Sequence, residues 1–143
     1  MSNDSHLFKI ARKVSKKADY SGCCDVKIGC VVTYKHTILA KGFNTDKTHT
    51  KQDYYNKWRY KDSGNRYLPS KGHAECLALC KIQYLDIDFS KVHIYTYREL
   101  KNGKPALARP CPSCLALIRD MGIRHIHYTT DCGFASEELV KEK

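Results

Sequence analysis

Long hydrophobic runs are absent from this sequence. The most continuous apolar segment, residues 28–32, is far too short to span a lipid bilayer. Residues 1–14 also lack the apolar stretch of a secretory signal peptide. These two absences argue against a membrane protein. We therefore expect a soluble chain that stays in the cytoplasm and has no membrane partner.

Acidic residues are scarce relative to basic ones. The chain carries 15 Asp and Glu residues against 25 Lys and Arg residues, a formal net charge of +10. A charge of this size attracts phosphates, polyanions and anionic lipid, and it carries no information about the fold. The alternative is a basic protein without any polyanionic partner. The positions of the charged residues in the sequence have to distinguish these two possibilities.

Proline and glycine are also sparse, with four and eight residues. The sequence shows no low-complexity segment, internal repeat or linker. Hydrophobic residues make up 42% and charged residues 28% of the chain, which are values of globular proteins and argue against disorder. A length of 143 residues suits one hydrophobic core, so we predict a single domain over residues 1–143.

Cysteine, in contrast, is abundant. An even number of cysteines could form disulfides, but in the reducing cytoplasm metal binding or simple burial is favoured. The eight cysteines are Cys23, Cys24, Cys30, Cys76, Cys80, Cys111, Cys114 and Cys132.

Hydrophobic periodicity predicts alternating helices and strands. In the first helix the apolar stripe is Leu7, Ala11, Val14 and Ala18. The last fourteen residues fit an edge strand or a frayed helix equally well. The order of elements predicts an α/β fold with one mixed sheet and helices on both faces. We expect helices over 4–19, 73–84 and 111–121, strands over 26–34, 36–43, 91–98 and 123–129, and a short extended piece over 105–109.

A long polar segment, residues 44–72, precedes the second predicted helix. A loop of this length inside a compact domain is usually functional. Its aromatic side chains can stack on bases and its cations can follow phosphates. We interpret it as a substrate-lining loop, and a surface loop whose aromatics pack on the domain is the alternative. The interleaved residues are Tyr54, Tyr55, Lys57, Trp58, Arg59, Tyr60, Lys61, Arg66, Tyr67 and Lys71.

A Cys-x-x-Cys pair opens the third predicted helix. Cys111 and Cys114 are three residues apart, which places both sulfurs on one side of the first turn. The free N–H groups and partial positive charge of a helix N-terminus favour thiolate over thiol. Pro110 and Pro112 cost little there, because those N–H groups have no partner within the helix. Two adjacent thiolates suit a zinc ion.

A His-Ala-Glu triplet opens the second predicted helix. Because helical side chains tilt toward the N-terminus, His73 and Glu75 can both reach past the end of the helix. His73 would then be a third zinc ligand, with Glu75 beside an open fourth position. Three protein ligands and one open position are the pattern of catalytic zinc, and a carboxylate placed to accept a proton from water completes it.

The two motifs in this order resemble the cytidine and deoxycytidylate deaminase superfamily, over roughly residues 25–130. The resemblance implies a three-layer α-β-α fold with one mixed sheet of four to five strands. It also implies a Zn²⁺ cofactor held by His73, Cys111 and Cys114. Glu75 would take a proton from water, pass it to the ring nitrogen beside the attacked carbon, and later protonate the departing amine as ammonia leaves.

The resemblance also implies substrate contacts. The backbone N–H of Ala74 would contact the base carbonyl, and Asn44 matches an asparagine that holds the sugar or base, although a turn asparagine is the alternative. Arg109, immediately before the second motif, is a candidate phosphate contact. Family members are often dimers or larger, so a homo-oligomer is left open.

Three substrates fit this reading. A cytosine nucleotide such as dCMP is favoured because the domain is small, ahead of cytosine in single-stranded DNA or RNA and adenosine in tRNA. The chain departs from each pattern: Gly42-Phe43-Asn44-Thr45 stands where deoxycytidylate deaminases usually have Gly-Tyr-Asn-Gly. Polynucleotide editors carry a tryptophan-serine pair before Pro-Cys, and Leu107-Ala108-Arg109 stands there instead.

Other readings of the motifs remain open. Cys111 and Cys114 could form a redox pair, or a closed structural zinc site could take Cys30, Cys76 or His49 as a fourth ligand. A zinc-stabilised nucleic-acid-binding module without turnover is a further alternative, and Glu75 would have no role in it. His125 and His127 share one strand face, and we interpret them as ordinary sheet residues.

Overall fold

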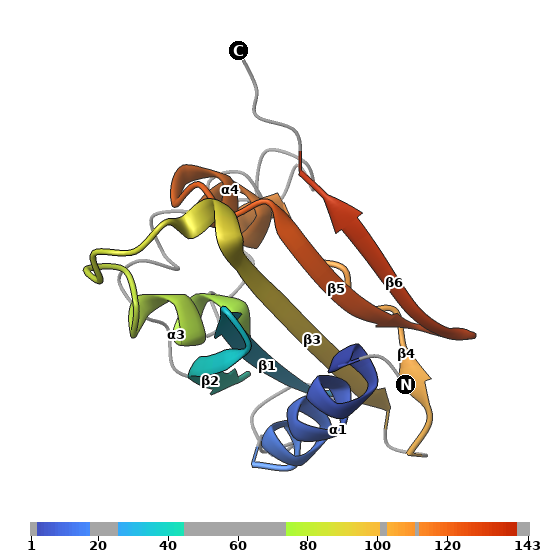
Figure 1. Cartoon of the computed structure of the whole chain (residues 1–143). Helices are drawn as coiled ribbons and strands as arrows, with labels where there is room; N and C mark the ends of the chain where they lie inside the picture. The colour runs from blue at the N-terminus through green and yellow to red at the C-terminus, as the bar shows by residue number, and fades with distance from the viewer. Residues whose placement is uncertain (1–2, 18–25, 45–73, 101–102, 111, 140–143) are drawn as a thin grey trace, which may run out of the picture.

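The computed structural model describes residues 3–17, 26–44, 74–100, 103–110 and 112–139. These residues form one mixed sheet with helices on both of its faces (Figure 1). The helices are α1 (Asn3–Ser15), α3 (Ala74–Cys80) and α4 (Pro112–Asp120), with a 3₁₀ turn, η2 (Phe89–Lys91). The strands are β1 (Val26–Tyr34), β2 (Thr37–Phe43), β3 (Val92–Leu100), β4 (Pro105–Ala106), β5 (His125–Thr130) and β6 (Gly133–Glu138).

The sheet has the strand order β2-β1-β3-β5-β6, and the two-residue β4 pairs with β3 outside this path. β3 and β5 run parallel, while the other neighbouring strands run antiparallel. A parallel pair needs a crossover connection, and α4 supplies it between β3 and β5. The predicted α/β fold with a mixed sheet and helices on both faces is therefore confirmed.

Alternating side chains of β1 face opposite sides of the sheet, as a strand with a period of two requires. Cys30 and Val32 belong to the core under α3 and α4, whereas Val31 belongs to a second core under α1. All three residues are fully buried. This central strand is thus covered on both faces, which explains its nearly continuous run of apolar residues.

Helix α1 lies directly on β1. A Cβ atom at Gly29 would collide with backbone atoms of Ala11 and Ser15, so only glycine allows this approach. On β3, the buried carboxylate of Glu99 accepts hydrogen bonds from Arg12 Nε at 3.3 Å and Lys16 Nζ at 3.4 Å. The close backbone packing at Gly29 and the ion pairs of Glu99 therefore hold α1 on this face of the sheet.

Helix α3 approaches the other face in the same way. A Cβ atom at Gly42 of β2 would collide with the carbonyl oxygen of Ala74 and lie 2.8 Å from the amide nitrogen of Ala78. The glycine lets the first turn of α3 rest on the backbone of β2. The close approach places the start of α3 beside the end of β2.

Two helices end earlier than predicted, and the undecided C-terminal segment is now assigned. The first helix was expected to continue to residue 19, but α1 ends at Ser15, whose Oγ donates to the carbonyl of Arg12 at 2.6 Å and competes with the helical pattern. The second helix was expected to reach residue 84, but α3 ends at Cys80 because the following amides bond to carbonyls three residues back. The last fourteen residues, left open by the sequence, contain the edge strand β6.

The turn between β1 and β2 falls where the sequence predicts it, at Lys35 and His36. No helix among the described residues is long and apolar enough to cross a membrane.

Candidate active site

Glu75 lies in the first turn of α3 and is buried, with only 5% of its surface exposed. Ala74, which begins the helix, is fully buried. A buried carboxylate is costly unless hydrogen bonds or a nearby cation compensate it, so buried ionisable groups are uncommon outside functional or paired positions. The predicted proton carrier therefore occupies an interior position.

Cys114 lies in the first turn of α4 and is 1% exposed. Helices α3 and α4 pack against each other on the same face of the sheet. The structure thus brings the helix that carries Glu75 next to the helix that carries a predicted zinc ligand.

The other two predicted zinc ligands, His73 and Cys111, lie outside the described residues, each immediately before a described helix. Among the residues that the structure describes, no group of three His, Cys, Asp or Glu side chains is arranged to hold a metal ion. The predicted set of His73, Cys111 and Cys114 therefore stays a prediction. The donor chemistry fits zinc, since one imidazole and two thiolates are ligands that zinc accepts.

Cys30 of β1 is fully buried close to Glu75. Burial raises the pKa of the Cys30 thiol well above its usual range, and the negative charge of Glu75 raises it further. The neighbouring Thr96 hydroxyl opposes this shift weakly, because it makes no full hydrogen bond to any described atom. These effects favour a neutral thiol at Cys30.

Asn44 follows β2 and is also buried. Its side-chain oxygen accepts a hydrogen bond from the backbone N–H of Ile28 at 2.9 Å. The backbone N–H of Asn44 donates to the carbonyl of Ile28 at 3.2 Å. Asn44 therefore extends the β1–β2 ladder by one position. It lies two residues beyond Gly42, where β2 touches the start of α3.

Arg109 lies at the end of the segment that leads into the second motif. Its guanidinium donates to the carboxylate of Glu137 on β6, with Nε 2.7 Å from Oε2. The hydroxyl of Tyr128 donates to the same Glu137 oxygen at 2.8 Å. These two donors lower the pKa of Glu137, with the Arg109 hydrogen bond as the largest cause. The candidate phosphate contact is thus held by an acidic partner.

The segment between β4 and α4 is fixed to β5 by Thr129. The Thr129 hydroxyl donates to the carbonyl of Ala106 at 2.7 Å and accepts from the N–H of Arg98 at 3.1 Å. The N–H of Ala108 donates to the carbonyl of Thr129 at 2.9 Å. Thr129, which the sequence analysis did not single out, is fully buried and sets the course of the chain toward Cys111.

Other sequence-based candidates fall elsewhere. Except for Asn44, the predicted substrate-lining loop over residues 44–72 lies outside the described residues, as does His49. Cys76 and Cys80 lie one turn apart with their sulfurs 4.0 Å from each other. His125 and His127 share a face on β5, and they stack with side chains of β3 rather than converging on a metal position.

Comparison with known proteins agrees with this arrangement. Residues 1–130 match the family described as "Cytidine and deoxycytidylate deaminase zinc-binding region". The chain belongs to this family. A search of curated proteins found no match.

Solved structures of deaminases share the fold. The dCMP deaminase of cyanophage S-TIM5 in apo form superposes with a TM-score of 0.60 at 21% identity, covering 91% of this chain and 86% of that one. The cytidine deaminase of Burkholderia pseudomallei superposes with a TM-score of 0.62 at 15% identity, covering 96% and 93%. The deaminase family and its α/β fold are therefore established for this chain.

Proposed function

We propose that this protein is a zinc-dependent hydrolase that converts a cytosine base to uracil and releases ammonia, acting on a cytidine or deoxycytidine nucleotide such as dCMP. The observation that carries the proposal is the buried carboxylate of Glu75 in the first turn of α3, next to the helix that carries Cys114. A zinc-stabilised binding module without turnover has no use for a buried acid at this position.

His73, Cys111 and Cys114 would hold the zinc ion, which supplies a Lewis acid and acidifies water. A positive ion near the start of α3 would also offset the cost of burying the Glu75 carboxylate. The donor set has three protein ligands, as in catalytic zinc sites, and leaves the fourth position to water or substrate.

Glu75 would move two protons in the reaction. Its carboxylate accepts the first proton from the attacking water and gives it to the ring nitrogen next to the carbon that bears the amino group. The hydroxide adds to that carbon. Glu75 then carries the remaining hydroxyl proton to the amino group, the carbon–nitrogen bond breaks, and ammonia leaves. One water is consumed, and the base keeps a carbonyl oxygen in place of the amine.

Burial serves this transfer. A carboxylate excluded from bulk water exchanges its proton with the substrate rather than with solvent. Ala74 is buried at the same helix start, and in this proposal its backbone N–H would orient the base through the base carbonyl.

A free nucleotide is the substrate class that we favour. Arg109, immediately before the second motif, is the candidate phosphate contact, because a guanidinium matches phosphate geometry; its guanidinium is paired with Glu137 and would have to share or exchange this partner to bind phosphate. Among the solved structures that share this fold, the dCMP deaminase of cyanophage S-TIM5 has been determined in complex with dCMP and dUMP, at 19% identity, a TM-score of 0.57 and coverage of 91% and 84%.

The decisive experiment compares purified wild-type protein with Glu75→Gln. Zinc is quantified, and ammonia release is measured with cytidine, deoxycytidine, CMP, dCMP, a cytosine-containing oligonucleotide and a tRNA. We expect one zinc per chain in both proteins, release from dCMP by the wild type, and a loss of at least about 100-fold in Glu75→Gln.

Glu138→Gln, which removes an exposed carboxylate on β6, is the matched control and should keep full activity. Equal activity in Glu75→Gln and wild type would refute the role of Glu75. A wild type that acts on the oligonucleotide and not on dCMP would refute the nucleotide assignment while keeping the deaminase chemistry.

A further inference from the structure

A cavity of about 440 Å³ lies on the α1 side of the sheet, away from Glu75. Thr33 and Tyr95 line it, and Tyr95 belongs to the core under α1. Glu75 belongs to α3, which packs on the opposite face. The cavity is therefore separate from the candidate active site. Its volume falls within the range typical of small-molecule pockets.

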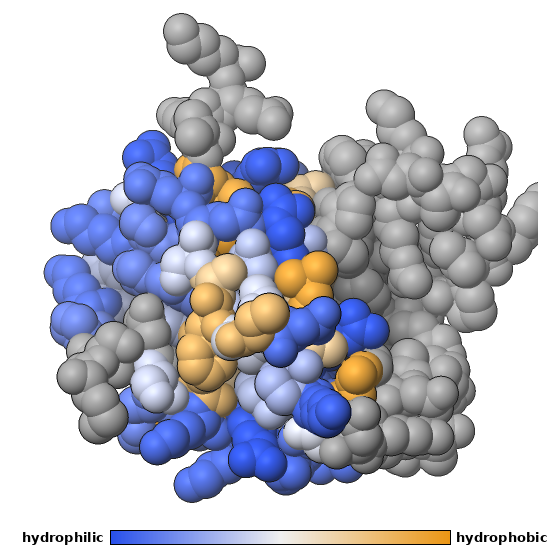
Figure 2. All heavy atoms as spheres, turned by 90° about the vertical axis from the view of Figure 1, so that its right-hand side faces the viewer, coloured by the Kyte–Doolittle hydropathy of each residue, from blue (hydrophilic) through white to orange (hydrophobic). Residues whose placement is uncertain are grey.

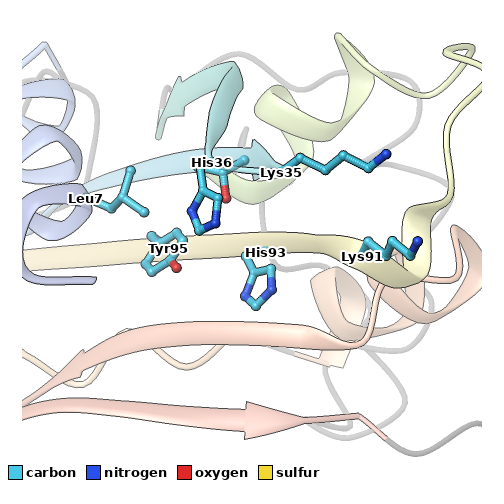
Figure 3. Close-up of a pocket in the computed structure, with 7 residues that line it drawn as sticks. Leu7, Lys35, His36, Lys91, His93 and Tyr95 are labelled. Atoms are coloured by element: carbon cyan, nitrogen blue, oxygen red, sulfur yellow. The ribbon is translucent and has the colours of Figure 1, made fainter. Parts of the chain in front are cut away.

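Basic and titratable side chains surround this cavity (Figure 3). Lys35 and His36 come from the β1–β2 turn, and Lys91 and His93 come from the start of β3. In the close-up, the side chains of Lys35 and Lys91 extend toward the same end of the pocket. Among the described residues no acidic side chain lines the cavity. The pocket is therefore positive where it opens.

The floor of the cavity is held rigidly. His93 is aligned across β3 and β5 with His125, and their rings stack with centroids 4.3 Å apart. His93 Nδ1 lies 2.8 Å from His127 Nε2, and His127 Nδ1 lies 2.6 Å from Ser136 Oγ. This chain of hydrogen bonds runs from β3 through β5 to β6 and fixes the orientation of the His93 ring.

The rim of the cavity is strained. Lys35 and His36 both have positive φ angles, 50° and 67°, in the two-residue turn between β1 and β2. Asn-Gly is the favoured pair in such turns, because residues with larger side chains resist this conformation. The sequence instead places a lysine and a histidine there, and both residues line the cavity. Strain of this kind is frequent in ligand clamps.

The acidic residue near the rim of the cavity does not neutralise the positive charge of the rim. Asp88, the residue before η2, has a lowered pKa chiefly because its carboxylate accepts hydrogen bonds from Ser90, and the charge of Lys91 contributes less. The Lys35 ammonium lies 5.2 Å from the centroid of the Tyr34 ring, a weak contact that an anion can replace. The Lys91 side chain lines the cavity, and the exposed Lys35 side chain has to leave the Tyr34 ring to bring its ammonium to a ligand there.

We propose that this cavity binds the phosphate group of a small phosphorylated molecule. Lys35 and Lys91 supply the charge, the Thr33 hydroxyl and the imidazole of His93 supply hydrogen-bonding groups at the floor, and Tyr95 closes the apolar side with Leu7. Lysine ammonium groups and hydroxyls are common phosphate partners. The assignment is independent of the deaminase chemistry, since no residue of the candidate active site takes part.

The first test is a titration of the full-length protein with inorganic pyrophosphate, which has no base and cannot be deaminated. Calorimetry gives the affinity, and NMR follows the imidazole signals of His36 and His93. We expect saturable binding that shifts both imidazoles. In Lys35→Gln/Lys91→Gln, affinity should fall at least about tenfold, the usual effect of losing a charged hydrogen-bonding partner.

The matched control is Lys13→Gln/Lys17→Gln, which removes the same charge near the end of α1, outside the cavity. It should bind pyrophosphate like the wild type. Equal weakening in both double variants, or imidazole signals that do not move, would overturn the proposal. A single-stranded oligonucleotide that shifts the same imidazoles at lower concentration than pyrophosphate would overturn the assignment to a small molecule.

The second test uses the strained turn. Lys35→Asn/His36→Gly installs the pair that this turn favours, so its melting temperature should rise above that of the wild type. Pyrophosphate binding should weaken at least about tenfold, because one ammonium and one imidazole are lost. A variant that is more stable and binds as tightly as the wild type would refute the role of the rim, and loss of folding cannot explain a weaker affinity in a stabilised protein.

Discussion

The side-chain oxygen of Asn44 accepts the backbone N–H of Ile28 at 2.9 Å. This bond uses the side-chain oxygen to continue the β1–β2 ladder, and we propose that the amide nitrogen contacts the substrate. Asn44 therefore has two separable roles, one in the strand pairing and one predicted at the substrate.

Two substitutions at Asn44 should separate these roles. Asn44→Asp keeps an acceptor for Ile28 and removes the amide donor, so we expect a KM for dCMP raised about tenfold, as for one lost hydrogen bond. Its melting temperature should fall as well, because the new carboxylate is buried. Asn44→Ala should also lose about 1 kcal/mol of unfolding free energy. Steady-state kinetics and thermal melts check both. An unchanged KM in Asn44→Asp would show that Asn44 is only a ladder residue.

Gly42→Ala should disturb the start of α3. The added methyl group collides with the carbonyl of Ala74, so α3 or β2 has to move. We expect a loss of about 1–3 kcal/mol in the free energy of unfolding, measured in urea, together with reduced deaminase activity. Gly103→Ala is the control: this glycine has a φ of 83° with no atom near its added Cβ, so the variant should lose stability through backbone strain alone. Undiminished activity in Gly42→Ala would contradict the placement of α3.

Cys114→Ser should reduce zinc binding. Loss of a residue that hydrogen-bonds to a metal ligand typically lowers metal affinity roughly 10- to 100-fold. Loss of a direct ligand should lower zinc affinity by more than this. Zinc content after dialysis, measured by mass spectrometry, checks this. Cys132→Ser, which changes an exposed cysteine between β5 and β6, should retain the metal. Full zinc occupancy in Cys114→Ser would remove Cys114 from the ligand set.

Glu137→Gln should destabilise the protein at neutral pH and have no effect in acid. The folded-state pKa of Glu137 is lowered by Arg109 and Tyr128, so its contribution exists above the unfolded pKa of about 4.3 and disappears as the pH falls through the lower folded value. The Arg109–Glu137 pair is partly exposed, so we expect about 0.5–1 kcal/mol at pH 7.

Urea unfolding of Glu137→Gln and wild type at neutral and strongly acidic pH measures this difference. Glu138→Gln, the exposed neighbour, is the control and should match the wild type at both values. A difference that persists unchanged in strong acid would contradict the electrostatic cause.

Local sequence patterns predicted much of this fold. Strand β1 occupies the predicted range because apolar side chains recur along it, and the turn at Lys35 was visible as a break between two strands. The apolar stripe of α1 was only partly predicted: Phe8 is buried, whereas Leu7 is half-exposed. Strand β6 could not be chosen from its alternating small and polar residues, because pairing with β5 decides its structure.

The site was predicted through residue identity rather than geometry. The motifs indicated Glu75 and Cys114, and the structure adds that both are buried on adjacent helices. The contact of His93 with His127 could not be predicted, since it depends on the parallel register of β3 and β5. The partnership of Arg109 with Glu137 likewise joins residues that lie far apart in the chain.

Four large apolar side chains are exposed among the described residues, and Phe134 is one of them. Phe134 is 56% exposed and stacks on Phe8 of α1 with ring centroids 4.1 Å apart. Figure 2 shows hydrophobic side chains in the middle of the face that includes β4 and β6, with hydrophilic ones around them. Phe134 thereby shields an edge of the core that α1 covers.

Gly29 and Gly42 lie on neighbouring strands, where Cys30 pairs with Gly42, yet they admit helices on opposite faces. At this corner α1, the sheet and α3 form three layers whose backbones pack directly on one another. No side chain lies between these layers that could adjust to a change in their spacing. A substitution that thickens either layer has to be met by movement of a whole helix. We therefore expect evolutionary drift to be slowest at this corner, even at positions that never meet a ligand.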